Sequence, residues 1–437
     1  MTDTDTNHAQ KEEKVNPAEE FQLFRTKPSK DEKYAPPDRF YLVFMLFFFF
    51  GMGVALPGPL FSRAQDYWEY KFRDPSSDHA DQRNRTELQI RFITWKYYFD
   101  IGPCLIALAA TSMFGHKVGT RVKIIPSLAI ICAMNLGYCI FCNINTDSWQ
   151  REFLYVTLAM STITSAAVIV FTVSNIVPMS KFPNRYVKYY MYGNAVGGIL
   201  AALLQCIALS IGGSSIVTGL IYFSVGTVIM LYTLFLAIIS NRLPLYQYYM
   251  DDTMVVEKPV HSFKEMFGVG KKIWVNLISI VVNLFFIMPG VPYSVISENH
   301  GTVFAVKYFR PVCTHILSDA ASLVGRIFSG PYITKRNRYL ALLTNIATVG
   351  SFGILLLFCR TSPKRNSPLL FPHDWEYMCI LGLHQVFFHF FIVSMILSVR
   401  NLVKPNQVEM GFLIMTSISE VLAMFMGFLA KLWMSIV

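Results

Sequence analysis

Two opposite charges, Asp319 and Arg326, stand in the otherwise apolar stretch ILSDAASLVGRIF at residues 316–328. A helix turns by about 100° per residue, so seven steps bring both side chains to within about 20° of one face, roughly 10 Å apart along the axis. That separation is too long for a direct ion pair, but the two charges can bracket a polar molecule, with the Ser322 hydroxyl between them. The spacing therefore predicts a binding site for a small polar ligand.

Three further charges, Lys96, Asp100 and Glu420, fall inside apolar runs, where an unpaired charge is costly and usually faces a cavity or a partner. Lys96 and Asp100 are four residues apart and can pair along one helix, either as part of the binding site or only to hold helices together. Glu420 has no partner nearby in the sequence, so we expect it to face a cavity. The alternative to a binding site is that Asp319 pairs with Lys96, and Arg326 with Asp100 or Glu420.

The composition indicates the kind of molecule that must position these charges. The chain has 437 residues, 53% hydrophobic and 15% charged, with a mean hydropathy of +0.41, whereas soluble domains are about 25% charged. This favours a polytopic membrane protein. The net charge of +10 then indicates basic cytoplasmic loops and not nucleic-acid binding. The cysteines lie in or beside apolar runs, and no catalytic or cofactor motif is present, so we expect no enzyme activity, no metal and no cofactor.

The apolar runs predict an all-α fold of about eleven membrane spans, each near the ~20 residues that a bilayer requires. The first 38 residues are polar, and we expect a disordered cytoplasmic N-terminus over 1–38. Residues 39–240 then form a six-helix N-terminal bundle, 241–271 a cytoplasmic loop, and 272–437 a five-helix C-terminal bundle. The expected spans are 40–63, 90–113, 122–144, 153–178, 187–211, 215–240, 273–295, 303–330, 338–358, 376–398 and 410–435.

Lysine and arginine are more frequent in the segments that this alternation places inside the cell, which predicts a cytoplasmic N-terminus and an extracellular C-terminus. The outer loop 64–89 contains Asn84 in the tripeptide NRT, a glycosylation acceptor that fits this orientation. We expect a multi-pass protein, with the plasma membrane favoured over an organelle.

Prolines interrupt two spans at corresponding places. Pro57 and Gly58 lie in the outer half of the first span, and Pro289 and Pro292 in the outer half of the seventh, where each half of the chain begins. Matched interruptions are typical of transporters built from related halves, and we expect them to form an outer gate. The alternative is ordinary helix kinking. Gly193, four residues before another glycine, predicts close approach of a neighbouring helix.

Several stretches, in this order, resemble the equilibrative nucleoside transporter family. They are PPDRFYLVFMLFFFFGMGVALPGPLF, FPNRY (182–186), YGNAVGGILA, LPLYQYY (243–249), VGRIF, FPHDW (371–375) and VKPNQVE (403–409). The resemblance runs from the first span to the end of the chain. It implies a major-facilitator-like fold that moves nucleosides or nucleobases by alternating access.

The chain also departs from the family pattern. Gly58 stands where the family usually has tryptophan, Ser322 where it usually has aspartate in the eighth span, and Thr172 where a glutamine often reads the base. The resemblance therefore implies family roles for only four positions: Pro57, Gly193, Gly325 and Arg326.

The expected function is facilitative transport of nucleosides, with nucleobases second. Asp319 and Glu420 leave open an organic cation or amine as substrate, and the altered positions leave open a receptor-like or scaffold protein that no longer transports. The expected partners are a small-molecule substrate and the lipid bilayer. The sequence leaves open the oligomeric state, proton coupling, and the choice between purines and pyrimidines.

Overall fold

The computed structural model describes residues 34–76, 86–211, 214–251, 262–287, 290–299, 301–361 and 368–436. The candidate residues Asn84 and Pro289, and the expected disordered segment up to residue 33, lie outside this part of the chain. The described residues are almost entirely helical, with only two isolated β-bridges, Val295 to Thr361 and Cys359 to Phe371. The predicted all-α class is confirmed.

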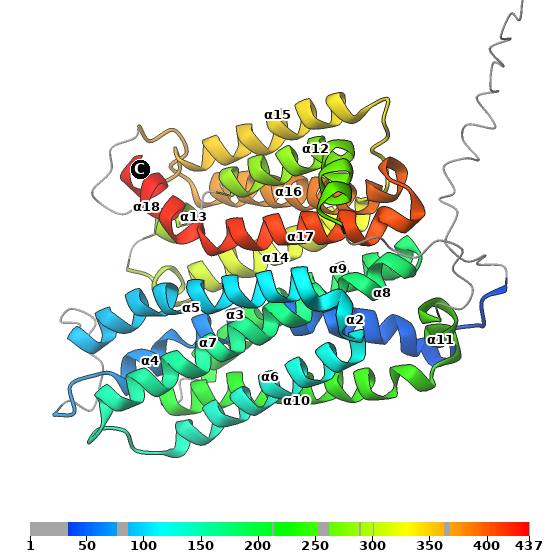
Figure 1. Ribbon diagram of the computed structural model, residues 1–437. Coiled ribbons are helices and arrows are strands. Elements are labelled where there is room, and N and C mark those ends of the chain that lie inside the picture. Colours follow the sequence, from blue (N-terminus) through cyan, green and yellow to red (C-terminus); the bar gives the residue numbers. More distant parts are fainter. Residues whose placement is uncertain are drawn as a thin grey trace, which may run out of the picture.

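The helices form two groups that lie against each other, coloured blue to green and green to red in Figure 1. The N-terminal group comprises α2 (Leu42–Ala55), α3 (Pro57–Arg63), α4 (Gln65–Lys71), α5 (Glu87–Phe114), α6 (Thr120–Asn143), α7 (Gln150–Ser174), α8 (Ile176–Lys181), α9 (Asn184–Ile211), α10 (Ser215–Ile239) and α11 (Pro244–Met250). The C-terminal group comprises α12 (Phe263–Phe286), α13 (Val291–Ser294), the π-helices η5 (Phe304–Tyr308) and η6 (Arg310–Ile316), α14 (Leu317–Phe328), α15 (Arg338–Leu356), α16 (Asp374–Leu402), α17 (Val408–Met424) and α18 (Met426–Ile436).

Ten helical stretches in the described part of the chain are long and apolar enough to cross a membrane. They correspond to all of the expected spans except the eighth, 303–330. That stretch is helical, but it consists of η5 and η6 followed by α14, and it carries the charges noted above. Pro311 lies in its π-helical part, and π-helical turns are rare and often occur at functional sites. The count of eleven spans stays a prediction.

The apolar cores reflect the two groups. One cluster of buried side chains lies within the N-terminal group and another within the C-terminal group, while a third runs through both. Glycines let helices approach closely. A Cβ atom on Gly193 of α9 would lie 1.8 Å from the Phe48 carbonyl oxygen of α2, and one on Gly325 of α14 would lie 2.2 Å from the Val386 carbonyl oxygen of α16. Neither position tolerates a larger residue without moving a helix.

The proline-containing spans differ from each other. In the first span Leu56 keeps helical dihedral angles, and its N–H donates to the Met52 carbonyl at 2.8 Å, so the helix continues with little interruption into Pro57. In the seventh span α12 ends at Phe286, and the chain turns at Gly290, whose φ of 94° is in the region that favours glycine.

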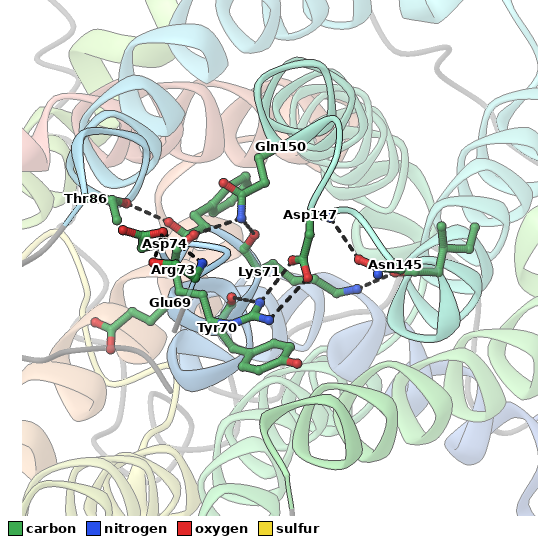
Figure 2. A network of polar contacts seen from close by, with 12 residues as sticks. Glu69, Tyr70, Lys71, Arg73, Asp74, Thr86, Asn145, Asp147 and Gln150 are labelled. Carbon is green, nitrogen blue, oxygen red and sulfur yellow. Dashed lines mark hydrogen bonds and ion pairs between the residues drawn. The ribbon is translucent and has the colours of Figure 1, made fainter. Parts of the chain in front are cut away.

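A polar network joins the segment after α4 to the turn between α6 and α7 (Figure 2). Arg73 forms a two-pronged ion pair with Asp147, with N–O distances of 3.1 and 3.3 Å, and its guanidinium lies 3.9 Å from the Tyr70 ring centre. Gln150 donates to the carbonyls of Lys71 and Arg73, at 3.1 and 2.8 Å. These bonds fix one end of the N-terminal group and lie apart from the candidate site.

Candidate functional site

A cavity of about 380 Å³ lies between the two groups of helices and is lined by both. The N-terminal group contributes α2, α3 and α9, and the C-terminal group contributes α13, η6, α14, α16 and α18. Its polar lining is concentrated on α14. The lining residues that can ionise or form hydrogen bonds through their side chains are Arg63, Asn194, Tyr293, Thr314, His315, Ser318, Asp319, Ser322, Arg326, Gln385 and His389. We refer to this space as the central cavity.

An ion pair crosses the central cavity. Arg63, the last residue of α3, places Nη2 3.1 Å from Oδ2 of Asp319 on α14, and its Nη1 donates to the Gly198 carbonyl of α9 at 2.8 Å. The Asp319 carboxylate packs directly on Gly198, where an added Cβ would lie 2.6 Å from Cγ. The proposed pairing of Asp319 with Lys96 is therefore wrong, because the cation that neutralises Asp319 is Arg63.

Arg326 joins α14 to α9 from the same cavity. Its Nη1 donates to the Asn194 side-chain oxygen at 2.8 Å and to the Met191 carbonyl. The residue is only 7% exposed, and its Nε is buried without a hydrogen-bond partner among the described residues. The proposed pairing of Arg326 with Asp100 or Glu420 is wrong, since its hydrogen-bond acceptors are neutral.

Lys96 and Asp100 lie away from the central cavity. Their side chains pair along α5 at 3.2 Å, and Asp100 also accepts hydrogen bonds from Thr162 and Ser165 of α7, at 2.9 and 3.0 Å. Lys96 lines a separate hollow of about 290 Å³ within the N-terminal group, 5.1 Å from the Phe61 ring centre. This geometry fits the alternative reading, in which the pair holds helices together.

Two other candidate binding residues are also outside the central cavity. Thr172 donates its hydroxyl to the Val168 carbonyl of its own helix at 2.8 Å, which leaves it pointing back along α7. Glu420 of α17 lies within electrostatic reach of Tyr190 and Cys104. We expected Glu420 to face a cavity, but it is not among the residues that line the central cavity.

Of the proline and glycine candidates, one lines the central cavity and others do not. Pro292 lines the central cavity, and its carbonyl accepts a hydrogen bond from the Tyr377 hydroxyl at 3.2 Å. Pro57 is buried within the first span, whereas Gly58 is exposed and has open space around its Cα. Tyr377 is also within 2.9 Å of the Thr314 hydroxyl, so α13, η6 and α16 are connected beside the cavity.

The two groups are also tied together at the end of the molecule that the charge pattern places in the cytoplasm. Lys188 of α9 donates to the Ser329 carbonyl at 2.9 Å, just after α14. Arg400 of α16 donates to the Met179 carbonyl of α8 at 2.7 Å. These contacts lie beyond the Arg326 end of α14, whereas the ion pair of Arg63 with Asp319 lies within the central cavity itself.

Sequence reasoning missed part of this site. Arg63 lies at the end of the first apolar run, where basic residues are common, and its only sequence signal was that Asp319 needed a cation. His389 also lines the cavity, and its Nδ1 is 3.1 Å from the Gln385 carbonyl oxygen of its own helix.

Relatives agree with the sequence resemblance, although no family model matches the chain. Rat equilibrative nucleoside transporter 3 is 26% identical over 230 residues, which cover 52% of this chain and 47% of that protein. Human equilibrative nucleoside transporter 2 is 22% identical over 437 aligned residues, covering 87% of this chain and 94% of that protein. Human equilibrative nucleoside transporter 1 is 21% identical, covering 78% and 85%.

Solved structures agree with the fold. A structure of the proton:xylose symporter XylE, a major facilitator superfamily protein, matches with a TM-score of 0.57 at 12% identity, covering 90% of this chain and 88% of that one. A structure of a double tryptophan mutant of XylE gives a TM-score of 0.60 at 13% identity, covering 91% of each chain. The resemblance to the equilibrative nucleoside transporter family is thereby confirmed, and the fold is that of the major facilitator superfamily.

Proposed function

We propose that this chain is a facilitative transporter of nucleosides, and secondarily of nucleobases, that works by alternating access through the central cavity. The observation that carries the proposal is that both groups of helices line one polar cavity. In transporters built from two related halves the substrate binds where the halves meet, and rocking of one half against the other opens the site to each side in turn.

The lining offers the groups that a nucleoside requires. Ser318 and Ser322 carry hydroxyls that both donate and accept, Gln385 has an amide, and Arg326 only donates. A volume of about 380 Å³ is in the range of small-molecule sites. Ribose hydroxyls and the edge of a base can each find a partner on this surface.

Alternating access requires that contacts between the groups break and reform. On the inner side these are the bonds of Lys188 with Ser329 and of Arg400 with Met179. The pair of Arg63 with Asp319, which lies within the cavity, also holds α3 against α14. Rocking of one group against the other must break and reform both sets of contacts.

An organic cation is a weaker candidate. Asp319 is the only carboxylate among the described residues that line the central cavity, and Arg63 already pairs with it. Glu420, the other acid that motivated this alternative, does not line the cavity.

Uptake into proteoliposomes tests the function directly. Purified protein should take up labelled uridine or adenosine, and more weakly hypoxanthine, with saturation and down the concentration gradient. Empty liposomes and liposomes with heat-denatured protein are the controls. Saturable uptake of a monoamine alone would favour the cation alternative, and no uptake of any of these solutes would favour a protein without transport function.

The orientation is part of the proposal. We propose a plasma-membrane protein with its N-terminus in the cytoplasm and its C-terminus outside, on the basis of the lysine and arginine distribution. An epitope inserted at Thr253 should then be inaccessible in intact cells, and glycosidase should shorten the wild type but not Asn84→Gln. An epitope that antibodies reach from outside would overturn this orientation.

A further inference from the structure

The formal charges of the side chains that line the central cavity do not cancel. The charged side chains are Arg63 of α3 and Asp319 and Arg326 of α14, and the lining also contains His315 of η6 and His389 of α16. With both histidines counted as neutral, two arginines and one aspartate give the described lining of the cavity a net charge of +1.

Of the two arginines, Arg326 is the one without a direct ion pair in the described part of the chain. Asp319 and Arg63 neutralise each other at 3.1 Å, whereas the hydrogen-bond acceptors of Arg326 are a backbone carbonyl and the amide oxygen of Asn194. Its Nε has no partner among the described residues, and the side chain is more than nine-tenths buried. A guanidinium stays charged in a protein. Asp319 is ion-paired with Arg63 and is also within electrostatic reach of Arg326, but one carboxylate cannot neutralise two arginines, so the described lining keeps one positive charge in excess.

We propose that, among the nucleoside- and nucleobase-like solutes of the proposed function, on which this inference rests, the cavity prefers those that carry a negative charge. Nucleobase carboxylates are the fitting class, because a planar carboxylate matches the planar donor fork of arginine. A cleft lined by one sign of charge and low-dielectric walls also concentrates ions of the opposite sign.

Orotate and uracil form a matched pair of probes, because they differ by the carboxylate. In proteoliposomes we expect orotate to be taken up with a kcat/KM about tenfold above that of uracil, which corresponds to the ~1.4 kcal/mol that one unscreened charge readily supplies at an effective dielectric constant near 20. Uptake of orotate should also carry charge and respond to an imposed membrane potential.

Two single variants change the net charge of the cavity, and their combination restores it. Arg63→Gln brings the cavity to neutral and should lower the ratio of orotate to uracil uptake, and Asp319→Asn raises the charge and should increase that ratio. The double variant restores the net charge of +1, so its ratio should return to that of the wild type. A merely structural ion pair would instead reduce the uptake of both solutes together and leave the ratio unchanged.

The outcomes separate this inference from the proposed function. Uptake of uridine and uracil with no preference for orotate, or a ratio that is equal in all four proteins, overturns the charge preference and leaves nucleoside transport standing. No saturable uptake of any of the three solutes, by protein that elutes as a single folded species, overturns both.

Discussion

Gly198 should be the position where one added methyl group perturbs the central cavity most. A Cβ atom there would lie 2.6 Å from both Cγ and Oδ1 of Asp319, and 2.8 Å from Oδ2. The Gly198 carbonyl also accepts the hydrogen bond from Arg63. Gly198→Ala must therefore push the carboxylate away from its place beside Arg63, or separate α9 from α14.

The size of the effect follows from the geometry. At 3.1 Å, two opposite charges attract by about 5 kcal/mol at an effective dielectric constant near 20, and a shift of ~1 Å lowers this to about 4 kcal/mol. Overpacking of a tight interface costs roughly 1–3 kcal/mol in its own right. We expect Gly198→Ala to lower the apparent melting temperature by a few degrees.

The neighbouring glycine provides the control. A Cβ on Gly197 would lie 3.4 Å from the Ala55 Cβ, at ordinary contact distance, and alanine is the better helix former. Gly197→Ala should therefore be neutral or slightly stabilising, although it lies on the same helix and adds the same atom.

A double-mutant cycle identifies the cause. Asp319→Ala removes the carboxylate that the new methyl group would meet, so adding Gly198→Ala to it should cost almost nothing further. All four proteins are compared by thermal unfolding in one detergent at one scan rate. If the two losses simply add, the methyl group does not act through Asp319, and our account of this contact is refuted.

Other residues lead to three further predictions. Pro57→Ala and Pro292→Ala should change the uptake rate more than the protein abundance if the outer gate lies there; reduced abundance with normal uptake per molecule would make both residues structural. Arg326→Lys should raise the KM of every substrate, because an ammonium cannot reproduce the planar fork, and unchanged kinetics would contradict a binding role. Outside the membrane, hydrogen bonding to Glu298 raises the pKa of His373, and the same bond lowers the pKa of Glu298. This contact should weaken as the pH rises through the His373 pKa or falls through that of Glu298, and Glu298→Gln should bring the His373 pKa, measured by NMR, back toward its ordinary value.

The fold could be predicted because membrane spans are recognisable in the sequence as long apolar runs. Ten of the expected runs are helices long and apolar enough to span a bilayer. The exception, residues 303–330, is the stretch in which polar side chains and Pro311 interrupt an apolar pattern. The polar side chains that let a span line a polar cavity also lower its hydropathy. The span that carries functional information therefore has the weakest hydropathy signal.

The site could be predicted only where one helix carries its parts. Asp319, Ser322 and Arg326 share a face of α14, and helical spacing alone places them together. Arg63 and Gly198 come from other helices, and no sequence spacing links them to Asp319. The pairing of Lys96 with Asp100 could also be predicted, because both residues lie four apart on one helix.

The position of the acid on α14 differs from the family pattern, and this difference explains its pairing with Arg63. In the family the acid lies one turn before the arginine, at the position of Ser322, whereas here the acid is Asp319, three residues earlier. From that position its carboxylate reaches across the cavity, over the bare Cα of Gly198, to Arg63. The acid thus forms its ion pair with a cation of the other helix group and is only within electrostatic reach of Arg326. One displaced acid therefore ties the two groups together while the described lining keeps a net charge of +1. Exchanging Asp319 and Ser322 (Asp319→Ser with Ser322→Asp) keeps that net charge, so it should break the pair with Arg63 and still leave the preference for orotate over uracil.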